Sequence, residues 1–284
     1  MSLEKYEFSL LKNISPMDVI NDPFPHVVIH DALPIDFASK LIDTFPFSSF
    51  PSEKSNHRYD ISASSVHDFD LISDQWKNFI QFHSSKYFFS EVINIFKNYL
   101  ERNDELTQLI QNHSMQVGRR NVESFKDSSV LMDAQISINT PVQKKSSVRK
   151  IHVDSPNKLY SGLFYLRMPD DDSFGGDLQL FSWKPEYSKK EKLNFYKEGV
   201  SKEHVNVIKE ISYNSNTLVL FLNSLDALHG VTERDVTRHT RTFVNLVAEL
   251  PFDLYTKDSL IKRKLFKIRV FLSKIKKFVA GFLY

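Results

Sequence analysis

The stretch Thr217-Leu-Val-Leu-Phe-Leu222 is a short run of strand length in which five consecutive apolar residues follow a threonine. It is one of about six strand-like runs in the second half of the chain, at 132–139, 160–167, 177–183, 204–211, 217–222 and 242–249. Pro, Gly, Asn and Asp residues separate these runs, and no helical pattern between them is long enough for a parallel crossover. The sequence therefore predicts a mainly β core, an antiparallel sandwich or jelly roll, over residues 130–250.

The residues before this core are predicted to be mainly helical. A short strand is expected at 24–31 and a helix at 33–45, and residues 74–102 carry apolar side chains at helical spacing with a break near Ser84-Ser85. Residues 48–70 are rich in Ser, Asp and His and are predicted to form a loop that lies over a site.

These patterns divide the chain into three predicted regions with an α+β fold overall. Residues 1–129 would form a helical support region, 130–250 the β core and 251–284 a C-terminal helix. With 41% hydrophobic and 25% charged residues, the composition is that of a soluble globular protein. Cysteine is absent, so a metal site would have to use His and carboxylate ligands. Without a secretory signal or a run of transmembrane length, we expect a cytoplasmic protein.

The C-terminal region 251–284 is predicted to be a basic amphipathic helix. Residues 257–284 hold nine Lys or Arg and one acid, and apolar residues recur every three or four positions from Ile261 to Phe282. Such a helix could dock on its own domain or on a second subunit, or lie peripherally on an anionic membrane surface. Contact with nucleic acid is the third use, but no nucleic-acid-binding motif supports it and none is expected.

His152-Val-Asp154 places an imidazole and a carboxylate two residues apart, which on an extended backbone turns both side chains to one face. His229 follows the strand-like run 217–222, where it could supply a third ligand. Two His and one carboxylate on one face of a metal suit Fe(II) oxygenases, and zinc enzymes are the competing use. The alternative without a metal is a His-Asp hydrogen bond on a strand, with His229 as an unrelated histidine at a turn.

The His152-Asp154 pair alone is weak evidence for a metal site, because a chain with ten His and 35 acids is expected to contain about one such match by chance. The order of features adds weight: the pair lies in the β-rich half, His229-Gly follows another strand, and Arg241 opens the next one. A cosubstrate with a distal carboxylate needs a fixed cationic fork, which Arg supplies bidentately.

Residues 131–250 resemble the prolyl 4-hydroxylase-like branch of the Fe(II)/2-oxoglutarate-dependent dioxygenases, whose core is a double-stranded β-helix. The stretches that match are His152-Val-Asp-Ser-Pro-Asn, Leu163-Phe-Tyr-Leu, Gly175-Gly-Asp-Leu-Gln-Leu-Phe, Thr217-Leu-Val-Leu-Phe, His229-Gly-Val-Thr and Arg241-Thr-Phe-Val-Asn-Leu-Val. The segment Pro23-Phe-Pro-His-Val-Val-Ile-His-Asp-Ala-Leu-Pro is similar to the opening of many such oxygenases, although it is less specific.

The resemblance assigns His152, Asp154 and His229 to Fe(II), and Arg241 to the C5 carboxylate of 2-oxoglutarate. Tyr165 matches the position at which related hydroxylases use a tyrosine hydroxyl to bind the same carboxylate. Arg238 remains a rival, because the twelve residues from His229 to Arg241 exceed the usual interval. The implied activity uses O₂, with ascorbate as an accessory reductant, and couples conversion of 2-oxoglutarate to succinate and CO₂ with hydroxylation of a substrate.

Two other classes of function stay open at this point. A zinc hydrolase or cupin-type isomerase could use the triad but would leave Arg241 and Tyr165 without a task, and a non-catalytic binding module could share the fold. The substrate would depend on loops such as 48–70 and 184–203; a peptidyl proline, a free amino acid and a sugar-linked small molecule all fit. Strand alternation places Asn139, Lys158 and Asn245 near the pocket, and each could equally be an outward polar residue. Gly175-Gly176 is predicted to be a tight turn.

Overall fold

The structure is a computed structural model that describes residues 8–51, 54–101, 104–111 and 115–255. Its strands within these ranges are β1 (His26–Ile29), β2 (Arg58–Ile61), β3 (Val117–Arg119), β4 (Val130–Asn139), β5 (Lys158–Tyr165), β6 (Leu178–Trp183), β7 (Val205–Ile211), β8 (Thr217–Leu222), β9 (Leu228–Val231) and β10 (Arg241–Glu249). The α-helices are α1 (Ile35–Asp43), α2 (Asp74–His83), α3 (Lys86–Leu100), α4 (Asp104–Gln111) and α5 (Lys189–Glu198). Short 3₁₀ turns occur at Pro16–Asp18, Phe47–Ser49, Val66–Asp68 and Lys202–His204.

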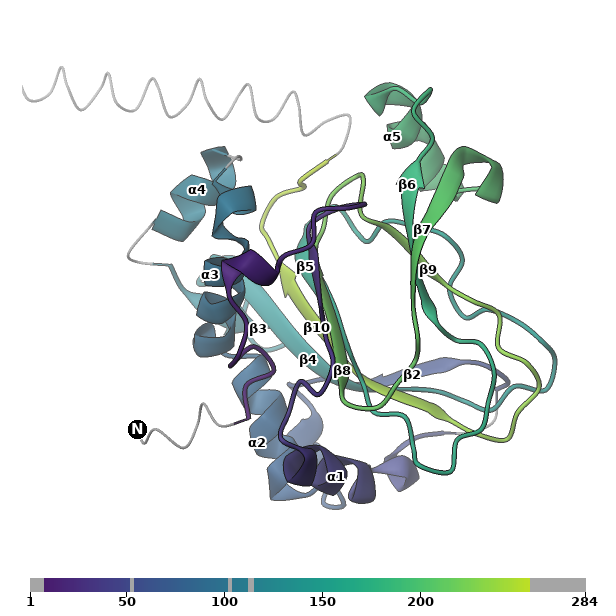
Figure 1. Cartoon of the computed structure of the whole chain (residues 1–284). Coiled ribbons are helices and arrows are strands. Elements are labelled where there is room, and N and C mark those ends of the chain that lie inside the picture. Colours follow the sequence, from purple (N-terminus) through teal and green to yellow (C-terminus); the bar gives the residue numbers. More distant parts are fainter. Residues whose placement is uncertain (1–7, 52–53, 102–103, 112–114, 256–284) are drawn as a thin grey trace, which may run out of the picture.

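The strands form two sheets that face each other (Figure 1). The larger has seven strands in the order β1-β8-β5-β10-β4-β2, with β3 pairing to β4, and the smaller has the order β7-β6-β9. Every pairing is antiparallel except that of β3 with β4. The protein is therefore α+β with a β-sandwich core, as the strand-like runs predicted.

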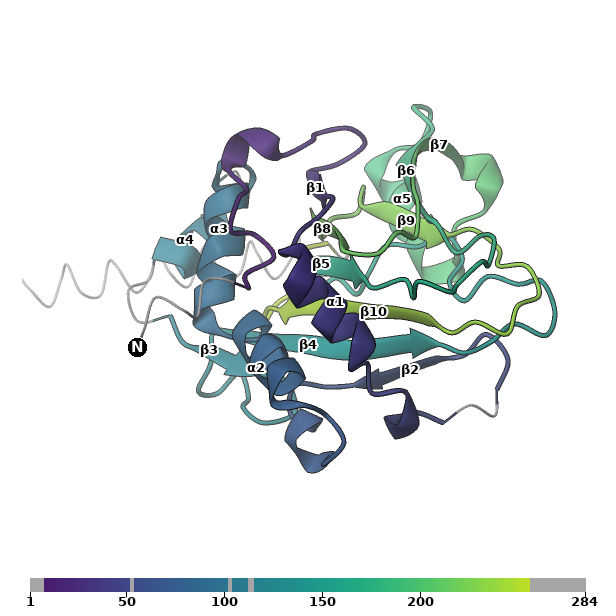
Figure 2. The same ribbon diagram turned by 60° about the horizontal axis from the view of Figure 1, so that its bottom comes forward.

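Helices cover the outer face of the larger sheet (Figures 1 and 2). Trp76 and Phe79 of α2 are fully buried, and the ring of Phe79 lies 5.9 Å from that of Phe164 on β5. Alternate residues of β4, from Val130 to Ile138, join the same apolar cluster. Because side chains alternate along a strand, the intervening residues of β4, β5 and β10 point into the space between the sheets.

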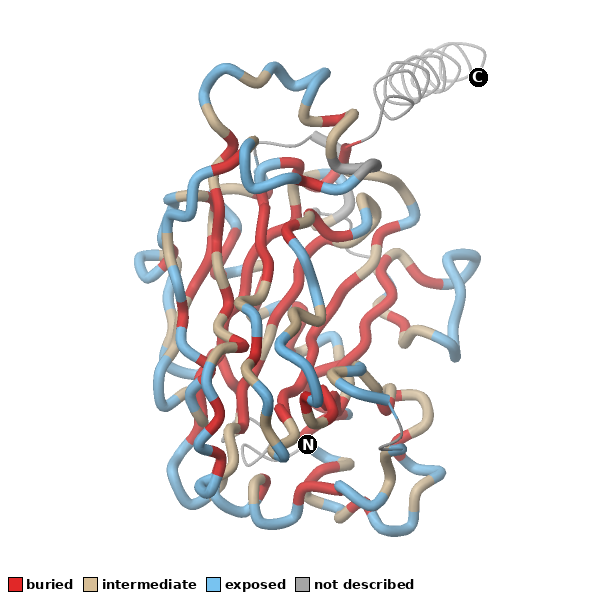
Figure 3. The backbone as a smooth tube through the Cα atoms, turned by 90° about the vertical axis from the view of Figure 1, so that its right-hand side faces the viewer, coloured by how far each residue is buried: buried red, intermediate tan, exposed pale blue. Residues whose placement is uncertain are grey.

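The inner face is apolar where the two sheets pack together. Leu178 and Leu180 of β6 lie in one cluster with Val219 and Phe221 of β8. Figure 3 shows that buried residues are concentrated along the strands and exposed ones in the loops at either end. The inner face of this sandwich carries the side chains that form the candidate site.

Most predicted elements are present. The predicted strands correspond to β1, β4, β5, β6, β7, β8 and β10, and the predicted helix at 33–45 is α1. The predicted break is confirmed, because Ser84 ends α2 and the Ser85 side chain caps the start of α3.

Two segments differ from their predictions. Residues 48–70 contain β2, which pairs with the edge of β4, because the chain returns to the sheet after α1. Residues 184–203 contain α5, which starts with a capping box between Ser188 and Glu191. The two glycines Gly175 and Gly176 have φ of 78° and 85°, which fits the predicted turn.

The division into 1–129, 130–250 and 251–284 stays a prediction. Strands β1, β2 and β3 from the first region pair with strands of the second, so the two share one large sheet. The basic amphipathic helix predicted for 251–284 lies almost entirely outside the described residues. Within the described residues, the helices are too short or too polar to cross a membrane.

His83, at the end of α2, is a fully buried histidine that the fold holds in its neutral form. Its Nδ1 lies 2.8 Å from the carbonyl oxygen of Phe79, and its Nε2 accepts the backbone N–H of Leu10 at 3.3 Å. Burial lowers the pKa of His83 to about 3. An unfolded histidine has a pKa of about 6.5, so the unfolded chain takes up this proton first as the pH falls.

We therefore expect the stability contributed by His83 to be complete above pH 6.5 and to be lost progressively toward pH 3. Between pH 6 and 4 the free energy of unfolding should fall by about 1.4 kcal/mol per pH unit from this residue alone. Urea denaturation at several pH values should give a shallower slope for His83→Gln. His67→Gln, which changes an exposed histidine, should keep the wild-type slope. Equal slopes for wild type and His83→Gln would contradict this expectation.

Candidate functional site

His152, Asp154 and His229 come together although 75 residues separate Asp154 from His229 in the sequence. His152 and Asp154 lie in the segment before β5, and His229 lies on β9. The backbones of the two histidines form an isolated antiparallel bridge, with both N···O distances at 3.0 Å. One ligand atom from each of the three side chains lies within 4.8 Å of the others.

The two histidine rings are oriented by backbone carbonyls. Nδ1 of His152 lies 2.8 Å from the oxygen of Lys150, and Nδ1 of His229 lies 3.0 Å from the oxygen of Ala227. In a neutral ring this places the proton on Nδ1 and a lone pair on Nε2. The Nε2 atoms lie 3.9 Å and 4.0 Å from the carboxylate oxygens of Asp154, so the three donor groups converge.

The electrostatics of the cluster favour two neutral rings and one carboxylate. Burial, the neighbouring His229 and the charge of Arg149 lower the pKa of His152 to about 3. Burial also lowers the pKa of His229. Burial by itself would raise the pKa of Asp154, but His229, Lys158 and His152 outweigh it and hold that pKa below its ordinary value. This is the donor set that a divalent transition metal needs.

Neighbouring side chains hold the carboxylate of Asp154 in place. Ser161 of β5 donates its hydroxyl to Oδ2 at 2.5 Å, and the ammonium group of Lys158 donates to Oδ1 at 3.1 Å. The hydroxyl of Tyr255 donates to the backbone oxygen of Asp154. Such outer contacts fix the orientation of a metal ligand. The sequence pattern did not identify Ser161 or Tyr255.

Arg241 is buried at the start of β10, on the inner face of the larger sheet. Its guanidinium carbon lies 4.7 Å from the ring centres of Tyr165 and Tyr213 and 5.2 Å from that of Phe243. Nη1 donates to the side-chain oxygen of Asn139, on the paired strand β4, at 3.4 Å. The result is an arginine enclosed by aromatic rings.

Several polar atoms around Arg241 are buried without a hydrogen-bond partner among the described residues. They are Nε and Nη2 of Arg241, the hydroxyl of Tyr165 and Nδ2 of Asn139. Leaving such groups unpaired costs about 1–3 kcal/mol each, and more for a charged group. Burial raises the pKa of Tyr165, and the nearby Arg241 only partly offsets this effect, so the hydroxyl keeps its proton and can donate it. Four unpartnered N–H and O–H donors thus gather around one guanidinium group, where an anion with several oxygens would accept hydrogen bonds from them.

The other candidate arginine, Arg238, lies on the surface. A different arginine, Arg234, is buried near Arg241, and its pKa is lowered to about 10, mainly by burial. Arg234 donates to the carbonyl oxygens of Thr140 at 3.2 Å and His239 at 2.8 Å. These backbone contacts, with a further one to the side chain of Asn56 at 3.5 Å, are those of a structural residue, and no local sequence pattern indicated that Arg234 would be buried.

The remaining predicted pocket residues lie on the inner face. Asn139 contacts Arg241, and Lys158 contacts Asp154. Asn245 donates to the side-chain oxygen of Gln135 at 2.7 Å. Tyr213, which forms one wall around Arg241, was missed because it lies between β7 and β8, outside any strand pattern.

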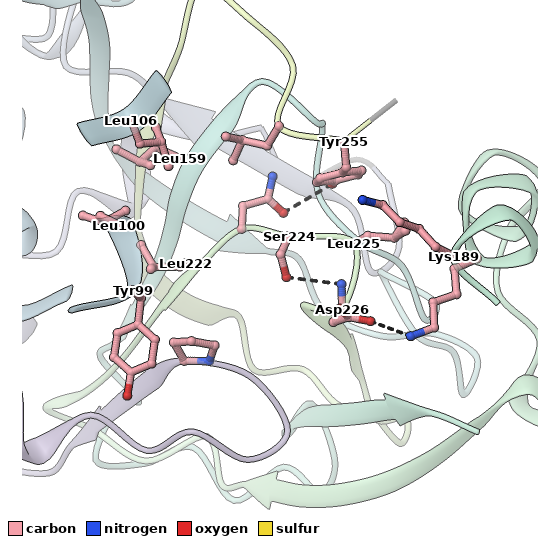
Figure 4. Close-up of a pocket in the computed structure, with 14 residues that line it drawn as sticks. Tyr99, Leu100, Leu106, Leu159, Lys189, Leu222, Ser224, Leu225, Asp226 and Tyr255 are labelled. Carbon is pink, nitrogen blue, oxygen red and sulfur yellow. Dashed lines mark hydrogen bonds and ion pairs between the residues drawn. The ribbon is translucent and has the colours of Figure 1, made fainter. Parts of the chain in front are cut away.

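A separate pocket of about 430 Å³ lies beside the site (Figure 4). Leucines dominate its lining, and Lys192 and Asp226 form a 2.8 Å ion pair in its wall. Tyr255 lines the pocket and also contacts the backbone of Asp154. Neither the triad nor Arg241 lines it, so we assign this pocket no part of the candidate chemistry.

No protein-family model matches the chain, and no curated protein matches it by sequence. Among solved structures the chain is similar to a prolyl 4-hydroxylase from Phytophthora capsici, with a TM-score of 0.50 and 14% identity over 95% of this chain and 75% of that one. A prolyl 4-hydroxylase from Pseudomonas putida gives a TM-score of 0.44 and 12% identity, over 83% and 98% of the two chains. A Trichoplax adhaerens prolyl hydroxylase, solved with a peptide fragment of the hypoxia inducible factor oxygen degradation domain, gives 0.41 and 15%, over 87% and 91%.

At this identity, the likeness to the Phytophthora capsici protein shows a shared fold. That neighbour is a prolyl 4-hydroxylase, and the sequence motifs resemble the same family. The cluster of His152, Asp154 and His229 is compatible with the metal-binding motif of 2-oxoglutarate-Fe(II) oxygenases.

Proposed function

We propose that this protein is an Fe(II)- and 2-oxoglutarate-dependent dioxygenase that hydroxylates a substrate and releases succinate and CO₂. One observation carries the proposal: the His152, Asp154 and His229 cluster shares the sandwich with a buried arginine, Arg241, two of whose nitrogens have no partner among the described residues. A metal site in the same sandwich as a group of buried, unpaired donors suits a cosubstrate that chelates the metal at one end and carries a carboxylate at the other. The proposal includes a double-stranded β-helix topology for the core.

Each residue has a defined task in this proposal. Fe(II) and 2-oxoglutarate would supply the oxidising chemistry, in which O₂ oxidises 2-oxoglutarate to succinate and CO₂ while the substrate is hydroxylated. His152, Asp154 and His229 would hold the metal from one face, which leaves the opposite positions open. Arg241 and the hydroxyl of Tyr165 would bind the C5 carboxylate and so orient the cosubstrate. Ascorbate would serve as an accessory reductant.

A non-redox metal enzyme is the competing proposal. A zinc hydrolase or cupin-type isomerase would use the same triad, but neither gives the unpartnered donors of Arg241 and Tyr165 a ligand. A buried cation with two unpaired nitrogens is costly, and a bound dicarboxylate removes that cost. The polar atoms around Arg241 therefore favour the oxygenase.

The test is anaerobic addition of Fe(II) and 2-oxoglutarate, followed by O₂. We expect a weak visible charge-transfer band before O₂ is admitted and release of succinate afterwards. Zn(II) in place of Fe(II) should give neither. A chain that binds Fe(II) but shows no band and no succinate with 2-oxoglutarate would rule the proposal out. Peptidyl proline, amino acids and sugar-linked small molecules are the proposed substrate classes for the same succinate assay.

Tyr165→Phe separates the cosubstrate role of Tyr165 from its packing. The change should weaken 2-oxoglutarate binding about three- to tenfold, because a neutral hydrogen bond contributes about 0.5–1.5 kcal/mol. Without 2-oxoglutarate the variant should be at least as stable as wild type, because a buried hydroxyl without a partner is removed. Calorimetric titration and thermal unfolding measure the two effects.

The chain offers a matched control for this change. Tyr160 lies on the same strand, and its hydroxyl is also buried without a partner, but it belongs to the outer cluster beneath the helices. Tyr160→Phe should therefore leave 2-oxoglutarate binding unchanged. Equal effects of the two substitutions would remove Tyr165 from the cosubstrate site.

A further inference from the structure

Two cations touch the candidate metal ligands, and the proposed function gives neither of them a contact with the substrate. Arg149 donates its Nε–H to Nε2 of His152 at 2.9 Å, and Lys158 donates to Oδ1 of Asp154 at 3.1 Å. The two acceptor atoms are 3.9 Å apart, so both cations lie against one edge of the triad.

That edge is the open side of the triad. The side chain of His152 is 19% exposed and that of Lys158 is 20% exposed, whereas those of His229 and Asp154 are 8% and 9% exposed. Arg149 lies on the surface. A substrate that approaches the metal from solvent therefore meets Arg149 and Lys158 first.

The loop that carries Arg149 is basic and is fixed at its base. Residues 142–151 contain four Lys or Arg and no acid. The backbone oxygen of Arg149 accepts hydrogen bonds from the N–H of Val231, on β9, at 3.2 Å and from the hydroxyl of Ser147 at 3.0 Å. Lys145 is paired with Asp235 at 2.8 Å, but among the described residues no carboxylate forms an ion pair with Arg149. The loop thus holds a cation without a counterion beside the triad.

The contact between Arg149 and His152 excludes a metal from the same atom. An imidazole Nε2 has one lone pair, which either accepts the N–H of Arg149 or binds a metal ion. Metal binding must therefore move Arg149 away from His152, and the guanidinium is then left with its donors directed to solvent. Lys158 has three donors, of which one is used on Asp154. Glu249, opposite Lys158 in the sheet register, is paired with Arg120 at 3.3 Å.

We propose that Arg149 and Lys158 form a binding site for an anionic group of the substrate, a carboxylate or a phosphate, and that metal binding opens this site by displacing Arg149 from His152. The inference rests on the proposed function, because it needs a metal at the triad. It deepens that function by naming the chemistry of the substrate: an anion held at the rim of the metal centre. Guanidinium and ammonium groups are the common protein ligands for both kinds of anion.

The first experiment measures Mn(II) affinity in the full chain. Arg149→Gln removes the competing donor and should bind Mn(II) about three- to tenfold more tightly, the range that loss of one hydrogen bond gives. Lys150→Gln is the matched control, because it removes a neighbouring charge from the same loop without touching Nε2 of His152, and it should stay within about twofold of wild type. Equal gains in both variants, or weaker binding by Arg149→Gln, would overturn the displacement.

The second experiment titrates inorganic phosphate and, separately, acetate into protein loaded with Mn(II) and 2-oxoglutarate, at constant ionic strength. At least one anion should bind wild type and Lys150→Gln equally, and about tenfold more weakly to Arg149→Gln and to Lys158→Gln. The tighter of the two identifies the preferred anion. If binding persisted in the variant that carries both Arg149→Gln and Lys158→Gln, the anion would be bound by the metal and not by these side chains. If neither anion bound to wild type, there would be no such site. Either result would overturn the proposal. If 2-oxoglutarate itself fails to bind wild type, the failure belongs to the proposed function instead.

Discussion

Asp154→Ala should abolish stoichiometric Fe(II) binding and lower the rate of succinate release by more than about a hundredfold. The carboxylate is the one anionic group in the triad, and its two oxygens lie 3.9 Å and 4.0 Å from the histidine nitrogens. Loss of an outer partner of a metal ligand commonly costs about 10–100-fold in affinity or activity, and loss of the ligand itself should exceed that. Metal titration and succinate release under O₂ measure the two effects.

The control for this prediction is a carboxylate outside the triad. Asp226→Ala removes an exposed acid that pairs with Lys192 and should leave metal binding and succinate release unchanged. Unfolding of the metal-free proteins shows whether each variant is folded. If folded Asp154→Ala bound Fe(II) as wild type does, the triad could not be the metal site.

Arg241→Ala should raise the concentration of 2-oxoglutarate needed for half-maximal turnover by at least about a hundredfold, with Mn(II) affinity unchanged. Each hydrogen bond to a charged group contributes about 1.5–3 kcal/mol, and the two nitrogens of Arg241 that lack partners can supply two such bonds. Arg241→Lys should recover part of the loss, because it keeps the charge but not the planar fork. The dependence of succinate release on 2-oxoglutarate concentration measures both.

Arg238→Ala separates the two arginines that the sequence proposed for this task. Arg238 lies on the surface, so its removal should change the 2-oxoglutarate requirement by less than about twofold. A larger effect for Arg238→Ala than for Arg241→Ala would move the cosubstrate site. Thermal unfolding of Arg241→Lys checks that any loss of 2-oxoglutarate binding at this buried position does not result from a loss of folding.

The strands of the core were predictable because their apolar runs are local patterns. The run 217–222 became β8, which is buried along its whole length between β1 and β5 of the larger sheet. The break at Ser84-Ser85 was also predictable, since two small polar residues interrupt an apolar stripe and both act at helix ends. Strands β2, β3 and β9 are three or four residues long and were not predicted, because they lack the consecutive β-branched residues that indicated the equally short β1.

The candidate site also contains contacts that the sequence predicted and contacts that it did not. The spacing of His152 and Asp154 indicated that both side chains would share a face, and the fold brings them within reach of His229. The spacing could not show that Arg149 would contact His152, or that Lys158 and Ser161 would both bind the Asp154 carboxylate. Those contacts depend on how the segment before β5 meets β9.

The sequence by itself determined the strand-rich core, the type and order of the proposed metal ligands and the presence of an arginine at the start of the last strand. These are properties of local periodicity and side-chain chemistry. Only the tertiary structure decided which arginine is buried: Arg241 pairs in register with Asn139 on β4 and is enclosed by Tyr165 and Tyr213, whereas Arg238 stays on the surface. Burial and unpaired donors arise from strand pairing between distant segments, which no local pattern records.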